Sequence, residues 1–112
     1  MAKQTSSRSR SVRGSRTGRP IMVLLDLLGR RWSLRILWEL RGRPLTSRAL
    51  RTACDEASPT VLQARLSELR EAGFLELGEG GGYGLTPLGR ELCEKFMPLH
   101  RFAERWCSES GA

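Results

Sequence analysis

The sequence is poor in the residues that build metal sites and disulfide frameworks. It contains three cysteines and one histidine among 112 residues, and none of the cysteines forms a C-x-x-C pair or a Cys/His zinc pattern. We therefore expect no metal and no cofactor. Two interpretations remain open for Cys54, Cys93 and Cys107: reduced, partly buried thiols of a cytoplasmic protein, or a redox-sensing thiol among them.

Long apolar runs are absent as well. No stretch approaches the ~20 apolar residues of a membrane-spanning helix, and the N-terminus has no apolar core of a secretory signal. The first 19 residues, rich in Ser and Arg, loosely resemble an organellar transit peptide but lack the apolar residues of an amphipathic helix. We therefore expect a cytoplasmic protein that does not contact membranes.

Residues for catalysis are equally scarce. The single histidine, His100, stands beside Arg101, and no nucleophile, base and orienting residue can be assembled around it. A glycine motif that cradles phosphates is missing too. These absences favour a protein that is not an enzyme.

Positive charge is what the sequence has in excess. The formal net charge is +7, and residues 1–19 carry six basic residues without one acid. The segment 29–70 carries nine arginines against four acids, whereas residues 71–112 carry seven acids against four bases. Such a basic segment is typical of a surface that faces phosphates, although basic surfaces also serve solubility.

The chain divides into three parts by composition. Residues 1–19 have almost no hydrophobic content and cannot bury enough surface to order themselves. They are expected to be a flexible basic arm, which either follows DNA phosphates or a minor groove, or is a solvated tail. Residues 20–107 form the folded domain, and residues 108–112 form a C-terminal tail.

Apolar residues at helical spacing predict three helices in the first half of the domain. They lie within residues 20–29, 33–42 and 46–53. Ser33 and Thr46 are expected to act as N-caps, because a side-chain oxygen at that position accepts a free backbone N–H.

Ser58-Pro59 is the strongest helix start in the sequence, a capping residue followed by proline at the first helical position. It predicts a helix that ends at Gly73. The alternating segments 74–77 and 83–86, separated by a glycine-rich turn, predict a β-hairpin.

Thr86-Pro87 repeats the same start signal and opens a last helix with a continuous apolar stripe. Pro98 is expected to interrupt and kink this helix, since proline removes a backbone donor. The predicted fold is mainly α with a small β-hairpin: a winged helix-turn-helix with a C-terminal dimerisation helix.

The helix that begins at Ser58 has an apolar stripe and an opposite face of small polar side chains, which suits the width of a DNA major groove. Arg65 lies on the flank of the apolar stripe, where an ion pair or a carbonyl clamp beneath the helix is expected. The candidates for base reading are Ser58, Thr60, Gln63, Ala64 and Ser67. The candidates for phosphate contacts are Arg30, Arg31, Arg43, Arg48, Arg51 and Arg70.

Four segments in series resemble a known family. They are residues 25–33 (LDLLGRRWS), 58–66 (SPTVLQARL), 69–74 (LREAGF) and 83–89 (YGLTPLG). From Pro20 to about Trp106 the chain is similar to the HxlR-type winged helix-turn-helix regulators, a branch near the MarR type. The resemblance implies a homodimeric DNA-binding regulator of bacterial type, whose subunits meet through their first and last helices.

The candidates for this dimer interface are apolar residues of those two helices. They are Leu24, Leu28, Leu92, Phe96, Leu99, Phe102 and Trp106.

The chain departs from the family pattern at two places. Arg19 stands where many members have a cysteine before the opening proline, and some members use that cysteine to sense oxidants or electrophiles. The wing is also short and glycine-rich, with Glu79 and without Lys or Arg between Ala72 and Leu88. We therefore expect little phosphate contact from its tip.

These features together predict a sequence-specific regulator of transcription, a repressor that binds double-stranded DNA as a homodimer on a pseudo-palindromic operator. A small-molecule effector is left open. The alternative is a winged-helix protein-interaction module without specific DNA binding, which the neutral-to-acidic second half and the acidic wing would fit.

Overall fold

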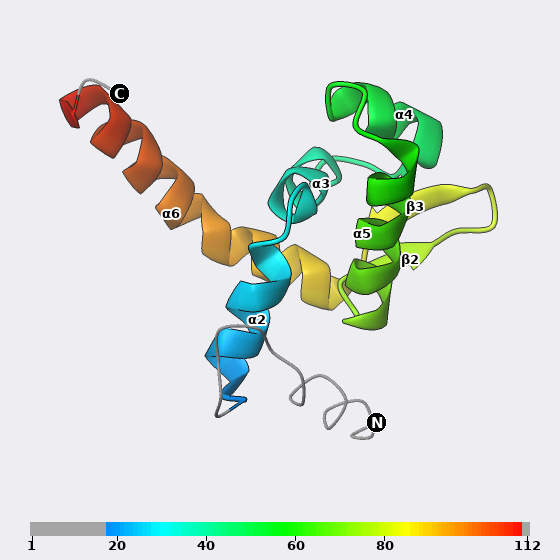
Figure 1. Cartoon of the computed structure of the whole chain (residues 1–112), viewed down its shortest axis with the longest axis horizontal. Helices are drawn as coiled ribbons and strands as arrows, with labels where there is room; N and C mark the ends of the chain where they lie inside the picture. The colour runs from blue at the N-terminus through cyan, green and yellow to red at the C-terminus, as the bar shows by residue number, and fades with distance from the viewer. Residues whose placement is uncertain (1–17, 111–112) are drawn as a thin grey trace.

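The computed structural model describes residues 18–110 (Figure 1). Most of the expected basic arm lies outside this range, as do the last two residues. Within it the elements follow the order α2, α3, β1, α4, α5, β2, β3, α6. The fold is mainly helical with one small antiparallel sheet, and it confirms the predicted winged helix-turn-helix class.

Helix α2 spans Pro20–Leu28 and ends at Gly29, as predicted. Helix α3 spans Ser33–Glu39, but its N-cap is Trp32, in the left-handed region at φ 75°. The predicted cap at Ser33 is wrong, because Ser33 already lies inside the helix with its side chain turned into the core. Its hydroxyl is fully buried and finds no hydrogen-bond partner among residues 18–110.

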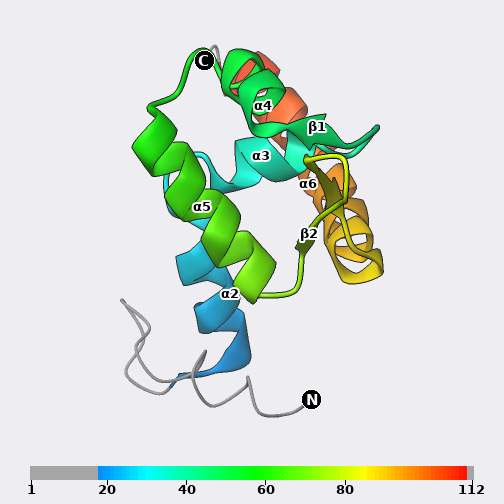
Figure 2. The same ribbon diagram turned by 90° about the vertical axis from the view of Figure 1, so that its right-hand side faces the viewer.

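Helices α4, Ser47–Ala53, and α5, Pro59–Glu71, both begin at their predicted caps. The Thr46 hydroxyl accepts the backbone N–H of Ala49 at 3.1 Å, and the Ser58 hydroxyl accepts that of Val61 at 3.5 Å. Between the helices, Asp55 and Glu56 adopt φ of 57° and 60°. This tight turn brings α4 to the N-terminal end of α5 (Figure 2).

The sheet has three strands where the sequence predicted two. Strand β3, Gly82–Leu85, lies between β2, Leu75–Leu77, and β1, Leu45–Thr46. Both pairings are antiparallel, with Leu45 opposite Tyr83 and Leu75 opposite Leu85. A two-residue strand cannot show an alternating pattern, so β1 becomes visible only through its partner.

Helix α6 spans Pro87–Ser110, so residues 108–110 continue the helix where a tail was expected. The helix also runs through Pro98 without a break, which makes the predicted interruption wrong. The carbonyl that loses its donor to proline is that of Glu94, four residues earlier. Glu94 and Pro98 are both exposed, so water can reach this side of the helix.

The core gathers leucines from every helix and two strands. Ile36, Leu37, Leu50 and Leu69 are completely buried in it. The first half of α6 closes the core with Leu92, whereas residues 101–110 are all exposed on the half that projects from the body (Figure 1).

Close backbone packing at Gly89 generates the first prediction. A Cβ at Gly89 would overlap the carbonyl oxygen of Phe74, which accepts the N–H of Thr86 and cannot move aside freely. We expect Gly89→Ala to destabilise the fold by about 3 kcal/mol, the cost of overpacking a tight site. The measurement is denaturant unfolding at one fixed protein concentration.

Gly42→Ala is the matched control, since nothing lies within 4 Å of a Cβ there. Similar unfolding midpoints for the two variants would contradict the close packing of α6 on the segment before β2.

Candidate nucleic-acid interface

The apolar stripe of α5 determines which of its residues face solvent. Leu62, Leu66 and Leu69 are buried against the body, and the opposite side is open. We call that opposite side the reading face; it consists of Thr60, Gln63, Ala64 and Ser67, all exposed. Ser58 is exposed too, but its hydroxyl is engaged in the N-cap.

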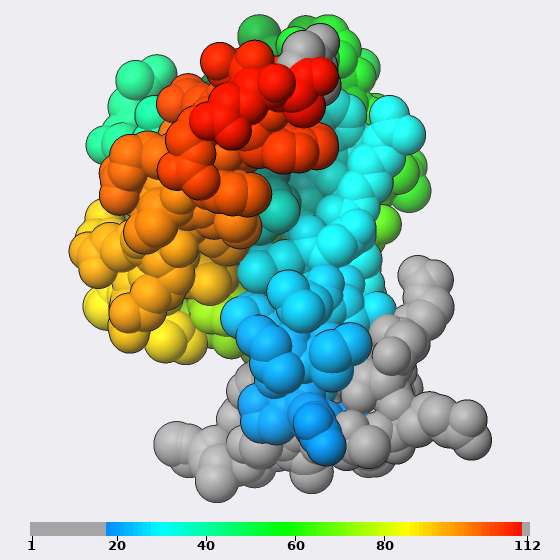
Figure 3. All heavy atoms as spheres, turned by 90° about the vertical axis from the view of Figure 1, so that its left-hand side faces the viewer, coloured from blue at the N-terminus to red at the C-terminus, as the bar shows by residue number. Residues whose placement is uncertain are grey.

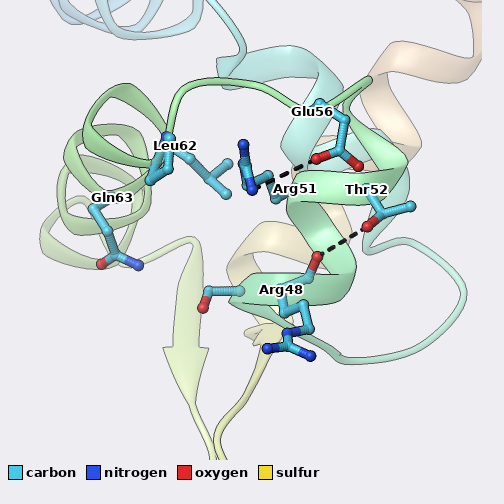
Figure 4. Close-up of a pocket in the computed structure, with 8 residues that line it drawn as sticks. Arg48, Arg51, Thr52, Glu56, Leu62 and Gln63 are labelled. Atoms are coloured by element: carbon cyan, nitrogen blue, oxygen red, sulfur yellow. Dashed lines mark hydrogen bonds and ion pairs between the residues drawn. The ribbon is translucent and has the colours of Figure 1, made fainter.

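A groove of about 270 Å³ separates the N-terminal part of α5 from α4. Figure 4 shows Leu62 pointing toward α4, with Gln63 and Arg48 at the edges of the groove. The lining residues are Ser47, Arg48, Arg51, Thr52, Glu56, Pro59, Leu62 and Gln63. Hydroxyl, amide and guanidinium groups thus converge beside the reading face.

The two arginines of this groove differ in their contacts. Arg51 donates from Nε to the carbonyl oxygen of Ala57 at 3.0 Å and pairs with Glu56 at 3.5 Å, so it holds the turn between α4 and α5. Arg48 is exposed and has no side-chain partner within residues 18–110. Its charge is therefore available to an anion.

The other phosphate candidates divide in the same way. Arg43 and Arg70 are exposed and, within the described part of the chain, unpaired. The guanidinium of Arg31 lies 5.5 Å from the centre of the Trp32 ring. Arg30, by contrast, binds two carboxylates, at 2.9 Å to Asp26 and 3.2 Å to Glu68.

Burial would lower the pKa of Arg30, but the hydrogen bond that Arg30 donates to Asp26 and the charge of Glu68 outweigh it and raise the pKa above its ordinary value. The spacing of Asp26 and Arg30, four residues apart, could have indicated this pair.

Arg65 confirms the expectation of a clamp beneath the helix. Its Nε donates to the carbonyl oxygen of Arg31 at 3.0 Å, and its Nη1 donates to Glu68 at 3.0 Å. Its guanidinium is thus occupied on the protein side of α5.

The wing is acidic, in contrast to the α4 side. A second groove, of about 490 Å³, runs between the C-terminal half of α5 and β2, and Arg70 shares it with Glu71 and Glu76. Charge therefore changes sign along α5, from positive near α4 to negative near the hairpin.

The candidates for a dimer interface divide by burial. Leu28 and Leu92 belong to the core of the single chain, and Leu24 and Phe96 pack partly against it. Leu99, at 61% exposure, lies on the projecting half of α6 with two exposed aromatic side chains, Phe102 and Trp106.

Two further apolar residues, which the sequence analysis did not single out for an interface, are exposed on α2. They are Ile21 and Leu25, one helical turn apart, at 57% and 52% exposure. Figure 3 shows α2 and the end of α6 on the same face of the molecule. We call the five exposed residues the seam: Ile21, Leu25, Leu99, Phe102 and Trp106.

The cysteines lie in different environments. Cys54 and Cys93 are buried, and burial raises the pKa of each thiol. Cys107 is exposed on the projecting half of α6. Within residues 18–110, no helix has the length and apolar character to span a membrane, and no three metal-binding side chains lie together.

Known proteins match this chain over most of its length. The HxlR-like helix-turn-helix family matches residues 27–111. The HTH-type transcriptional regulator sll1512 of Synechocystis is 30% identical over 99 residues, which cover 82% of this chain and 73% of that protein.

Solved structures of YodB from B. subtilis have the same fold. The quinone-bound form matches with a TM-score of 0.71 and 26% identity, over 76% of this chain and 96% of that one. The reduced form matches with a TM-score of 0.61 and 25% identity, over 80% and 91%.

Thiol reactivity tests the different environments of the three cysteines. A buried thiol with a raised pKa stays protonated at neutral pH and is shielded from reagents, so only Cys107 should react rapidly with a disulfide reagent such as DTNB. We expect one fast thiol per native chain and three in denaturant. Cys107→Ser should remove the fast phase; a fast phase that survives this substitution would show that Cys54 or Cys93 is accessible.

Proposed function

The chain belongs to the HxlR-like helix-turn-helix family, among whose relatives are transcriptional regulators, and on that premise we propose that it is a sequence-specific repressor. In this proposal a homodimer binds a pseudo-palindromic operator in double-stranded DNA and blocks transcription by occupying it. The exposed reading face of α5, bordered by the unpaired Arg48, supports the proposal most directly.

Base recognition is assigned to the reading face. An α-helix fits the major groove, where Gln63 can make two hydrogen bonds to an adenine edge. Thr60 and Ser67 supply hydroxyls that donate or accept, and Ala64 leaves room for a thymine methyl group.

Phosphate contacts are assigned to the arginines with free guanidinium groups. Arg48 lies beside the reading face, while Arg43 and Arg70 are also exposed. Arg31 complements them, although its guanidinium lies near Trp32. The acidic Glu71 and Glu76 favour an approach in which the N-terminal half of α5 lies deepest in the groove, because phosphates repel carboxylates.

The seam supports the homodimer. Three large apolar side chains stand exposed on the projecting half of α6, and two more stand exposed on α2, a helix that lies on the same face of the molecule. A second copy of the chain would remove them from water. Two-fold symmetry then places two α5 helices in successive major grooves, about 34–36 Å apart.

Fragment selection at physiological salt tests the function. We expect enrichment of one sequence made of two inverted half-sites. Gln63→Ala should then relax preference at one or two base positions, each by about 1–3 kcal/mol, because the bidentate contact is lost.

Arg48→Gln is the matched comparison, since it removes a phosphate contact. It should weaken binding evenly on all sequences and lower the salt slope by about one. If the wild-type protein enriches no sequence, the protein-interaction module is favoured. If Gln63→Ala weakens binding equally on all sequences, the residues that read bases lie elsewhere.

Sedimentation equilibrium tests the seam. Leu99→Glu inserts a charge into the proposed apolar contact, so at micromolar concentration it should shift the protein from dimer to monomer. Arg101→Glu, an exposed position two residues further along α6, is the control and should remain dimeric. A dimeric Leu99→Glu variant, or a monomeric wild-type protein, would contradict the seam.

A further inference from the structure

Four charged side chains join α2 to α5 in an unbroken series. Asp26 of α2 accepts from Arg30 at 2.9 Å, and the other terminal nitrogen of Arg30 lies 3.2 Å from Glu68 of α5. Both oxygens of Glu68 accept from Arg65 at 3.0 Å, and Arg65 clamps the carbonyl oxygen of Arg31 in the turn after α2. We call Asp26, Arg30, Glu68 and Arg65 the carboxylate–arginine chain.

The carboxylate–arginine chain is more sheltered from solvent than an ordinary surface ion pair is. The side chains of Asp26 and Arg65 are 12% and 20% exposed, and those of Glu68 and Arg30 are 28% and 32% exposed. Shielded, charge-assisted hydrogen bonds tolerate little change in distance or direction. Neighbouring members also support one another, because Glu68 is held by two guanidinium groups at once.

The apolar contacts of α5 allow more freedom than these hydrogen bonds do. Leu62, Leu66 and Leu69 hold α5 by burial, and the hydrophobic effect sets no direction for the contact as a hydrogen bond does. A hydrogen bond whose donor moves away by half an ångström is weakened strongly. The carboxylate–arginine chain is therefore suited to set the orientation of α5 about its own axis.

The other end of the carboxylate–arginine chain lies on α2, which carries two of the seam residues. Asp26 directly follows Leu25, an exposed seam residue of α2. In a dimer that forms through the seam, α2 of one subunit meets α2 of the other at the two-fold axis. Asp26 and Arg30 then link the orientation of α5 to that axis.

We propose that Glu68 and Arg65 are positioning residues which, through Arg30 and Asp26, fix α5 relative to the dimer seam and so determine the half-site spacing that the protein accepts. This inference rests on the proposed function. It assigns Arg30 to positioning, whereas the sequence analysis made it a phosphate candidate.

An ion pair elsewhere in the fold offers a close control. Arg35 donates to Glu39 at 2.8 Å and clamps the carbonyl oxygen of Ala53 at 2.6 Å, which ties α3 to α4 without touching α2. Glu39 and Glu68 have similar side-chain exposure, 26% and 28%. Glu39→Gln and Glu68→Gln thus each remove one carboxylate charge from a similarly exposed, arginine-paired site.

The experiment measures binding of the full chain to operators whose two half-sites are moved apart or together by one or two base pairs. Wild type and Glu39→Gln should discriminate equally between the best spacing and its neighbours. Glu68→Gln should lose about tenfold of that discrimination, the scale of coupling within one hydrogen-bond network. Base preference within each half-site should stay as in the wild type.

Asp26→Asn provides a second variant at the far end of the chain, away from the reading face, and should broaden the spacing in the same way. Arg30→Gln should also broaden it while the salt slope stays unchanged. A slope lowered by about one, with weaker binding at every spacing, would make Arg30 a phosphate contact.

The outcomes separate this inference from the function on which it rests. A wild-type protein that selects no operator refutes both. An operator-binding wild type whose spacing preference survives Glu68→Gln and Asp26→Asn refutes the positioning role alone.

Discussion

Burial of one side of α5 is the constraint on which the rest of the structure depends. Leu62, Leu66 and Leu69 supply the centre of the core, and α3, α4 and β2 pack on them. Because a helix places its residues about 100° apart, burying these three leucines leaves the small polar side chains facing outward. The reading face is therefore a by-product of core formation, which decides which side of α5 is turned toward solvent.

Arginine performs two physically different tasks in this molecule. Arg35, Arg51 and Arg65 each donate to a backbone carbonyl oxygen that no helix satisfies, and so hold the turns around α5. Arg43, Arg48 and Arg70 have no side-chain partner within the described residues and leave their charge exposed to solvent. A basic segment of this kind thus contains both structural clamps and arginines whose charge is open to solvent, and net charge alone does not distinguish them.

Several features follow from the sequence because their causes are local. The caps at Thr46 and Ser58 depend on a side chain three residues from its partner, and the prediction was confirmed. The cap predicted at Ser33 failed, because burial of this hydroxyl in the core overrode its local preference. The strand at Leu45 was missed for a related reason, since only pairing with Tyr83 makes it a strand.

The sequence by itself determined the fold class, the capped helix α5 and the identity of its polar face, since helical periodicity and capping are set within a few residues. It also placed Arg65 on the protein side of that helix. Only the tertiary structure decided which arginines are free, which apolar residues of α2 and α6 stay exposed, and that Arg30 joins Asp26 to Glu68. Those properties depend on residues about 40 positions apart meeting in space, as in the pair Arg30–Glu68, and no local pattern records that.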